Sequence, residues 1–248
     1  MDDDQLRRGA WDGIVEFQRI IGAHGPEANL TEHEHYVASA VPSIPSSLIN
    51  SAVPKNHALL TPHLDEIEGF FADSPKWGAW LDPDATQDAE ALKQRGLVLD
   101  STPVLMAAAL DDISGLGEAT HAQLTSMEEV GAVNDLAYGY SQPVIARAVG
   151  AFPADALYPY GLSVDDQLAS VAMIVDAGED AFVTMVATVP QHRGKHLASN
   201  LLRDALTEAR QRGRTTTSLQ ASKLGQGIYA RLGYRPLGEV HLYEKRPR

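Results

Sequence analysis

A short basic turn separates a run rich in β-branched residues from the start of an apolar helical stripe. The run AFVTMVATV (181–189) leads through Pro190 to the tetrapeptide RGKH at 193–196, and Leu197 opens the stripe. The first N–H groups of a helix have no intrahelical partner, and the helix dipole favours negative charge there. A glycine at this point lets a ligand approach the backbone, because it has no Cβ. The turn therefore predicts a binding site for a pyrophosphate.

Two nucleotide motifs that use such a turn do not occur at this place. A Walker P-loop needs GxxxxGK followed by Ser or Thr, but His196 follows Lys195, and Val189 stands where the first glycine should be. A Rossmann GxGxxG is also missing. The expected ligand is therefore a pyrophosphate ester of another kind.

The segments around the turn predict alternating strands and helices. The stripe after the turn has apolar residues at steps of one, three and four, which is typical of an amphipathic helix. A threonine-rich run follows it and favours a strand. In this half we expect strands at 119–124, 157–164, 167–175, 181–189, 215–221 and 236–245, and helices within 126–150, at 195–212 and at 225–233.

The N-terminal half shows a similar order of elements. Both halves run β-β-α-β-α-β, and the second helix of each ends in a related phrase, ALKQRGL at 91–97 and YARLGY at 229–234. We interpret this as a weak internal duplication, with domains over 1–114 and 115–248. The alternative is a chance similarity between two α+β segments. In this half we expect helices at 11–22, after Pro62 and at 84–96, and strands at 35–41, 46–53, 76–81 and 97–110.

The segment from the central strand to the last strand resembles the GNAT superfamily of N-acetyltransferases. The family signature Q/R-x-x-G-x-G/A opens a helix after a strand, and RGKHLA (193–198) takes those six places. His196 stands where the family most often has glycine. The resemblance covers 165–246, extends back to 119 and is only architectural over 1–110. It implies an α+β fold with two GNAT-like halves, each a mostly antiparallel sheet with flanking helices.

The resemblance also implies acetyl-CoA as cosubstrate, held between the strands at 181–189 and 215–221. The pantetheine arm would add to the first strand in the manner of an extra strand, and the pyrophosphate would bind the turn. The implied cofactor-binding residues are Val186, Ala187, Thr188, Arg193, Gly194, Lys195, His196, Leu197, Ala198 and Ser199.

The resemblance implies a catalytic role for one tyrosine. In the family, the Tyr before an LGF-like phrase often protonates the CoA sulfur, and IYARLGY places Tyr229 there. A positioned phenol can serve as such an acid, although Tyr229 could instead be a packing residue. Seven residues earlier the family often has asparagine, but this chain has Ser222.

For the general base and for the binding of the acceptor amine, the sequence leaves several candidates. For the general base, Glu179, Asp180 and His121 remain alternatives, as does water. Tyr138 and Tyr140 lie in a loop that the resemblance makes a wall of the substrate site, and ordinary surface aromatics are the alternative.

The charge distribution supports a localised anionic ligand. The 248 residues carry a net charge of −13, which disfavours nonspecific binding to nucleic acid. Residues 1–190 hold 8 Lys and Arg against 29 Asp and Glu, whereas residues 191–248 hold 12 against 4. Because the basic segment begins at the turn, we expect a polyanionic ligand there. A solvated basic face is the alternative.

Other patterns exclude several classes of protein. There is no cysteine for disulfides or thiolate sites, and no run of 18 apolar residues for a membrane span. The N-terminus MDDDQLRRGAWDG lacks the apolar segment of a secretory signal, so a cytoplasmic location is expected. GYSQP (139–143) begins like a nucleophile elbow but ends in proline, which disfavours a serine hydrolase.

One pair of histidines has a spacing that could serve a metal ion. His33 and His35 in EHEH would share one face of a strand, but zinc needs further ligands and a second shell. No distant partner stands out in the sequence, and no metal is expected.

The resemblance, taken with these observations, implies an enzyme that transfers an acetyl group from acetyl-CoA to a primary amine, by direct attack in a ternary complex. The expected acceptor is a small molecule, and a homodimer is a compatible assembly; neither nucleic acid nor membrane is an expected partner. The N-terminal turn NHALLTPHLDE (56–66) lacks arginine and glycine, so that half should not bind CoA and should instead shape the substrate cleft. The alternative is a noncatalytic acyl-CoA-binding module that regulates a partner.

Overall fold

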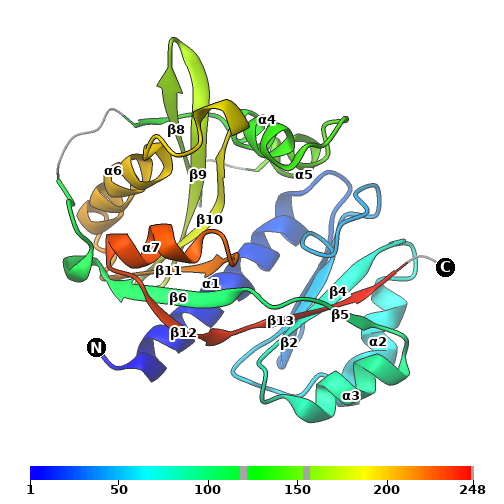
Figure 1. The fold of residues 1–248 in the computed structure, drawn as a ribbon. Helices are drawn as coiled ribbons and strands as arrows, with labels where there is room; N and C mark the ends of the chain where they lie inside the picture. The colour runs from blue at the N-terminus through cyan, green and yellow to red at the C-terminus, as the bar shows by residue number, and fades with distance from the viewer. Residues whose placement is uncertain (118–121, 153–156, 247–248) are drawn as a thin grey trace. The chain divides into compact units, whose positions relative to one another are not determined.

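The computed structural model describes residues 1–117, 122–152 and 157–246 of the chain. They form a mixed α+β protein with two mostly antiparallel sheets and flanking helices, as the sequence predicted (Figure 1). Each sheet belongs to its own compact unit. None of the described helices is long and apolar enough to cross a membrane.

Both compact units are built from two separate stretches of chain. The first unit consists of Met1–Gly13 and Leu105–Leu237, and the second of Ile14–Val104 and Gly238–Arg248. This arrangement differs from the predicted division at residue 114. Each end of the chain belongs to the unit that the other half mainly builds.

The first unit contains a seven-stranded sheet in the order β12-β6-β11-β10-β9-β8-β7. β10 is antiparallel to β9 and parallel to β11, and helices α4 and α6 both pack against β8, β9 and β10. The apolar stripe predicted for α6 is buried at Leu201, Leu202, Ala205, Leu206 and Ala209. The elements are β6 (Val104–Ala109), β7 (Gln123–Leu124), α4 (Met127–Tyr138), α5 (Ile145–Val149), β8 (Leu157–Val164), β9 (Gln167–Ala177), β10 (Asp180–Thr188), α6 (Leu197–Gln211), β11 (Thr216–Ala221), α7 (Gln226–Leu232) and β12 (Arg235–Glu239).

The second unit contains a six-stranded sheet in the order β1-β2-β3-β4-β13-β5. Its core includes Tyr36, Leu64 and Leu92, and the rings of Phe71 and Trp77 stack at 4.7 Å between centroids. The long helix α1 (Asp3–His24) begins in the first unit and continues in this one. The other elements are β1 (Asn29–Glu32), β2 (Tyr36–Ala40), β3 (Ser51–Pro54), the 3-10 turn η1 (Thr61–His63), α2 (Leu64–Phe70), β4 (Trp77–Leu81), α3 (Thr86–Gln94), β5 (Val98–Ser101) and β13 (His241–Lys245).

Two predicted strands are each divided between the two sheets. The expected strand at 97–110 becomes β5 and β6, interrupted at Pro103, which has no N–H for a ladder. The expected strand at 236–245 becomes β12 and β13, and Gly238 near the break has a φ of 104°. At the break, the Val240 N–H donates to the Pro103 carbonyl at 3.0 Å. At these two breaks, as within α1, the chain passes from one unit to the other.

Candidate acyl-transfer site

A cavity of about 600 Å³ opens in the first unit where β10 ends and α6 begins. The end of β10, the turn to α6, one side of α7 and the C-terminal end of α4 form its wall. Its volume lies in the range of small-molecule sites, about 300–1,000 Å³. Nine of the ten residues predicted to bind the cofactor line it, namely Val186, Ala187, Thr188, Arg193, Gly194, His196, Leu197, Ala198 and Ser199.

The central strands β10 and β11 diverge at this cavity. Residues 180–183 pair in parallel with 216–219, and no further pair between these strands is found in the described structure, although β10 continues to Thr188. β10 also bulges at 184–187, where Met185 has a φ of 53°. A bulge bends a strand and increases its twist. The freed edge of β10 can therefore accept an extended ligand as an additional strand.

The turn before α6 has a backbone geometry that suits an anion. Gly194 has a φ of 77°, and apart from Gly194 and its two chain neighbours, no described residue has a heavy atom within 4 Å of the place that a Cβ would take. The N-cap residue His196 also has a positive φ, of 62°. The Asn200 N–H donates to the His196 carbonyl at 3.1 Å, so the N–H groups of the first three helical residues have no intrahelical acceptor. Histidine thus adopts the left-handed backbone conformation that glycine adopts most easily.

The two basic side chains of the turn differ in their orientation. Arg193 lines the cavity, but its guanidinium donates to the carbonyl oxygens of Thr188 and Ala137 at 3.2 and 2.8 Å. Lys195 is not among the described lining residues, and its ammonium nitrogen lies 3.1 Å from Nδ1 of His192. Arg193 therefore joins the end of β10 to the end of α4 and fixes the shape of the wall.

Tyr229 lies on α7 and forms part of the cavity wall, with its side chain half-buried. Its ring packs edge-on against Tyr234, with 5.9 Å between the centroids. Burial, with a smaller contribution from Tyr138, raises the pKa of Tyr229 to about 12. The phenol is therefore protonated at neutral pH, so it can donate a proton but cannot act as a base.

The structure brings one of the two candidate substrate tyrosines to the cavity. Tyr138 is the last residue of α4, lines the cavity and is 69% exposed. Tyr140 follows the left-handed cap at Gly139 and is not one of the described lining residues.

Two of the three candidate bases lie away from the cavity. Glu179 and Asp180 stand at the start of β10, and a strand rises about 3.3 Å per residue, so Asp180 is about 20 Å from Val186. Asp180 is buried, accepts hydrogen bonds from the Thr216 and Ser218 hydroxyls, and has a pKa that burial raises to about 6. His121 lies outside the described residues. The ionisable side chains that do line the cavity are Tyr138, His192, Arg193, His196, Tyr229 and Arg231.

Many basic residues of 191–248 that do not line the cavity form ion pairs within the protein. Arg212 makes two hydrogen bonds of 3.0 Å to Asp176, and its guanidinium carbon lies 3.4 Å from the Tyr158 ring centre. The expectation that this positive charge serves a bound polyanion is wrong for such residues. Further pairs join Arg210 to Asp111, Arg235 to Asp3, Lys245 to Glu68, and Arg246 to Asp100.

The wall also contains residues outside the predicted cofactor set. Ser222, in place of the family's asparagine, accepts a hydrogen bond from the Gly225 N–H at 3.3 Å and so holds the start of α7. Ile228 and Arg231 lie one turn apart beside Tyr229, and this helical spacing was the available signal for both. Arg231 also borders a second cavity of about 400 Å³. The wall further includes Ala137, His192, Leu224 and Gly225.

A comparison with protein families identifies the domain. Residues 154–237 match the family model described as Acetyltransferase (GNAT) domain. This segment contains β10, α6 and α7, and with them most of the cavity wall. The chain carries a GNAT acetyltransferase domain. It is classed with the acyltransferases on that basis, and GNAT proteins generally use acetyl-CoA.

Solved GNAT structures share the fold over nearly the whole chain. A GCN5-related N-acetyltransferase from Kribbella flavida is 20% identical, with a TM-score of 0.68 over 96% of this chain and 95% of its own. One from Sphaerobacter thermophilus is 14% identical, with a TM-score of 0.61 over 88% and 82%. A tandem GNAT protein from the clavulanic acid biosynthesis pathway is 13% identical, with a TM-score of 0.57 over 100% and 96%. No curated protein matches the sequence.

Proposed function

We propose that this protein transfers the acetyl group of acetyl-CoA to a primary amine of a small molecule, by direct attack in a ternary complex. The observation that carries the proposal is a single cavity that contains the freed edge of β10, the N-terminus of α6 and Tyr229. These offer a surface for an extended chain, a site for an anion and a proton donor. An acyl-CoA has a matching part for each, in its pantetheine, pyrophosphate and sulfur.

The residues of the cavity fit such a ligand. Backbone groups of 186–188 lie along the freed strand edge, and the space beside Gly194 leaves room for phosphate oxygens. Two N–H groups of Arg193 donate to carbonyl oxygens. A guanidinium has five N–H donors, so others remain for a phosphate. Ser199 and Arg231 offer further polar groups in the same wall.

Among the side chains of the cavity wall, Tyr229 is the proposed hydrogen-bond donor to the leaving group. Acetyl-CoA supplies an acyl carbon activated as a thioester, with a thiolate as leaving group. Tyr229 has a pKa of about 12, against about 8.5 for an ordinary thiol, so complete transfer of its proton would cost about 5 kcal/mol. Tyr229 is therefore better suited to hydrogen-bond the charge that develops on sulfur than to lose its proton fully. His192 and His196 are the imidazoles of the described wall that could accept the proton of the amine.

The proposal assigns one acetyl-CoA site to each chain. The corresponding turn of the second unit leads through η1 into α2. The N–H groups of Leu60 and Thr61 donate to the buried carboxylate of Asp88, at 3.0 and 2.8 Å. An internal anion thus takes the donors that a phosphate would need, which supports a degenerate N-terminal unit.

Two measurements test this function. A panel of primary amines is screened for thiol release from acetyl-CoA, with mass spectrometry of the products, and calorimetry counts the acetyl-CoA sites. We expect amine-dependent release, an acetylated amine and one site per chain. Binding without transfer to any amine would favour the noncatalytic acyl-CoA module, and a second site would contradict the degenerate N-terminal unit.

A further inference from the structure

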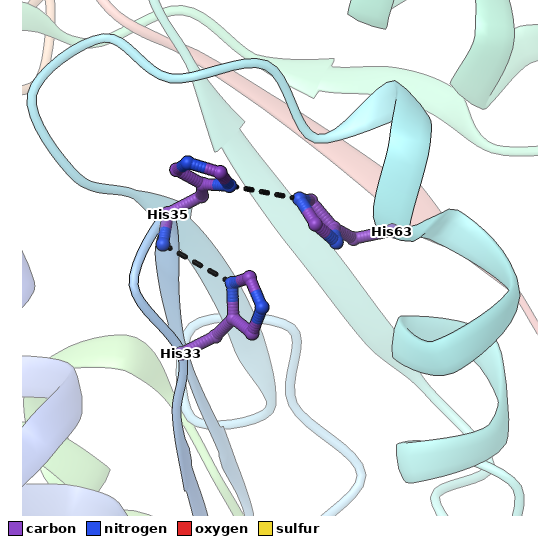
Figure 2. A group of neighbouring side chains, drawn as sticks. All are labelled: His33, His35 and His63. Atoms are coloured by element: carbon purple, nitrogen blue, oxygen red, sulfur yellow. Dashed lines mark hydrogen bonds between the residues drawn. The ribbon is translucent and has the colours of Figure 1, made fainter.

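Three histidines of the second unit meet at one place on its surface (Figure 2). One ring nitrogen from each of His33, His35 and His63 lies within 4.8 Å of those of the other two. His35 Nδ1 and His63 Nε2 are only 3.0 Å apart. The sequence showed only the first two of these residues, as members of one strand, and it offered no third ligand.

The local structure corrects the sequence interpretation of this pair. His33 and His35 are not in a strand; they belong to the tight turn between β1 and β2, where the His33 N–H donates to the Tyr36 carbonyl at 2.9 Å. The His35 N–H donates to His33 Nδ1 at 3.1 Å and orients that ring, which also stacks on Tyr36 with centroids 4.9 Å apart. The turn, rather than strand alternation, brings both imidazoles to the same side.

The backbone on both sides of the cluster is held by contacts that do not involve the imidazoles. The Lys55 N–H donates to the His35 carbonyl at 2.8 Å, and the Lys55 ammonium donates to the His33 carbonyl at 2.9 Å while it pairs with Glu32. On the other side, Asp88 holds the backbone of η1 through Leu60 and Thr61, two residues before His63. The three side chains are therefore presented by fixed backbone segments, as a metal site requires.

We propose that His33, His35 and His63 form a binding site for Zn²⁺, with water as the remaining ligand. Neutral imidazole is a preferred zinc ligand, and three protein ligands with an open position are a recurring arrangement. Zinc–nitrogen bonds of about 2.0–2.1 Å in a tetrahedron place ligand nitrogens roughly 3.3 Å apart. The pair at 3.0 Å already has nearly this separation, and His33 needs only a small movement of its ring.

Solvent can reach the site, which allows both metal entry and a bound water. His35 is exposed, and His33 and His63 are half-buried. Bound zinc would replace the proton between His35 and His63 and would join the β1–β2 turn to η1, segments separated by 28 residues. Zinc binding should therefore stabilise the second unit against unfolding.

The test is a zinc titration of the untagged full-length protein, in competition with a chromophoric chelator. We expect one site per chain, a dissociation constant at least tenfold weaker in His35→Gln and in His63→Gln, and no change in His24→Gln, an exposed histidine of the same unit. Zinc should also raise the unfolding temperature of the wild type but not of His35→Gln. Because His35 is exposed, its replacement leaves folding intact even if His63→Gln does not.

Either of two results would overturn the site: no zinc binding by the wild type, or equal affinity in wild type and His35→Gln. Cobalt provides a second readout, since the visible spectrum of Co²⁺ reports its coordination number. A four-coordinate spectrum that is lost in His35→Gln would support the site, and a purely six-coordinate spectrum would contradict it. None of these measurements depends on acetyl transfer, so the zinc site and the proposed function can fail separately.

Discussion

At the scale of the residue, Tyr229 allows chemistry to be separated from cofactor binding. Tyr229→Phe keeps the ring, whose centroid lies 5.9 Å from that of Tyr234, and removes only the phenolic hydroxyl group. We expect acetyl-CoA affinity to be retained and kcat to fall by roughly 10²-fold or more, the usual range for loss of a general acid. Calorimetry and steady-state kinetics measure the two effects. Tyr140→Phe is the matched control, because Tyr140 is not among the described wall residues.

A Tyr229→Phe variant with wild-type kcat would show that water protonates the leaving thiolate. The pH dependence gives a further check on the same residue. Since its pKa is about 12, Tyr229 stays protonated through pH 10, and no alkaline loss of activity below that pH should come from its ionisation.

A second residue, Asp180, makes stability depend on pH. Its folded-state pKa is raised from 3.8 to about 6, chiefly by burial. At pH values between about 4 and 6, Asp180 is therefore protonated in the folded state and ionised in the unfolded state. Its contribution to stability is therefore greatest below pH 4 and falls as the pH rises to about 6, by about 3 kcal/mol in total.

Asp180→Asn removes this titration while keeping the side-chain size. Relative to the wild type, the variant should gain roughly 3 kcal/mol of stability between pH 4 and pH 7, because it no longer buries a charge. Urea unfolding of both proteins at several pH values measures the difference. A stability difference that does not change with pH would show that Asp180 titrates at its ordinary pKa.

At the scale of the element, the start of α6 has a strained histidine at a ligand-binding turn. The left-handed conformation of His196 (φ 62°) costs a residue with a Cβ roughly 1–2 kcal/mol. In His196→Gly the relief of this strain offsets the higher entropy of the unfolded glycine, so stability should change little. The variant should bind acetyl-CoA several-fold more tightly, because the backbone becomes more accessible.

Calorimetry and thermal unfolding check this pair of effects, with His196→Ala as the control. Alanine keeps the strain and loses the imidazole, so His196→Ala should not gain affinity. A dissociation constant more than tenfold weaker in His196→Gly would contradict the argument and show that the imidazole itself contacts the ligand.

At the scale of the whole molecule, each sheet depends on a strand from a distant part of the chain. β13 lies between β4 and β5 in the second unit, and β6 lies between β12 and β11 in the first. The residues Leu105 and Ala107 of β6 are fully buried. A sheet that loses an interior strand loses both hydrogen-bond ladders and core contacts.

We therefore expect the fragment 115–248 to lack a cooperative unfolding transition. It contains the whole matched domain but neither β6 nor Met1–Gly13, where a Cβ on Gly13 would lie only 2.7 Å from the Phe182 side chain. Thermal unfolding followed by circular dichroism, with the full chain as reference, checks this. A fragment that unfolds cooperatively at the wild-type temperature would support the boundary predicted from the sequence.

The sequence by itself determined the local parts of the molecule. The start of α6, its buried stripe and the strand β10 follow from periodicity and from the glycine at 194, because each depends on neighbours within a few residues. The α+β class followed from the resemblance to the GNAT superfamily, which is carried by contiguous residues of the chain. The residues at 193–199 lie together because they are contiguous in the chain, and their roles in binding stay predictions.

The tertiary structure alone decided which distant segments meet. The sequence predicted one strand at 97–110 and one at 236–245, but it does not show that each divides between two sheets, since any apolar strand can pair with several others. Likewise, Arg193 reaches the carbonyl of Ala137, 56 residues away, and His63 reaches His35, 28 residues away. Such contacts are set by the packing of whole elements, and no spacing within a single segment contains them.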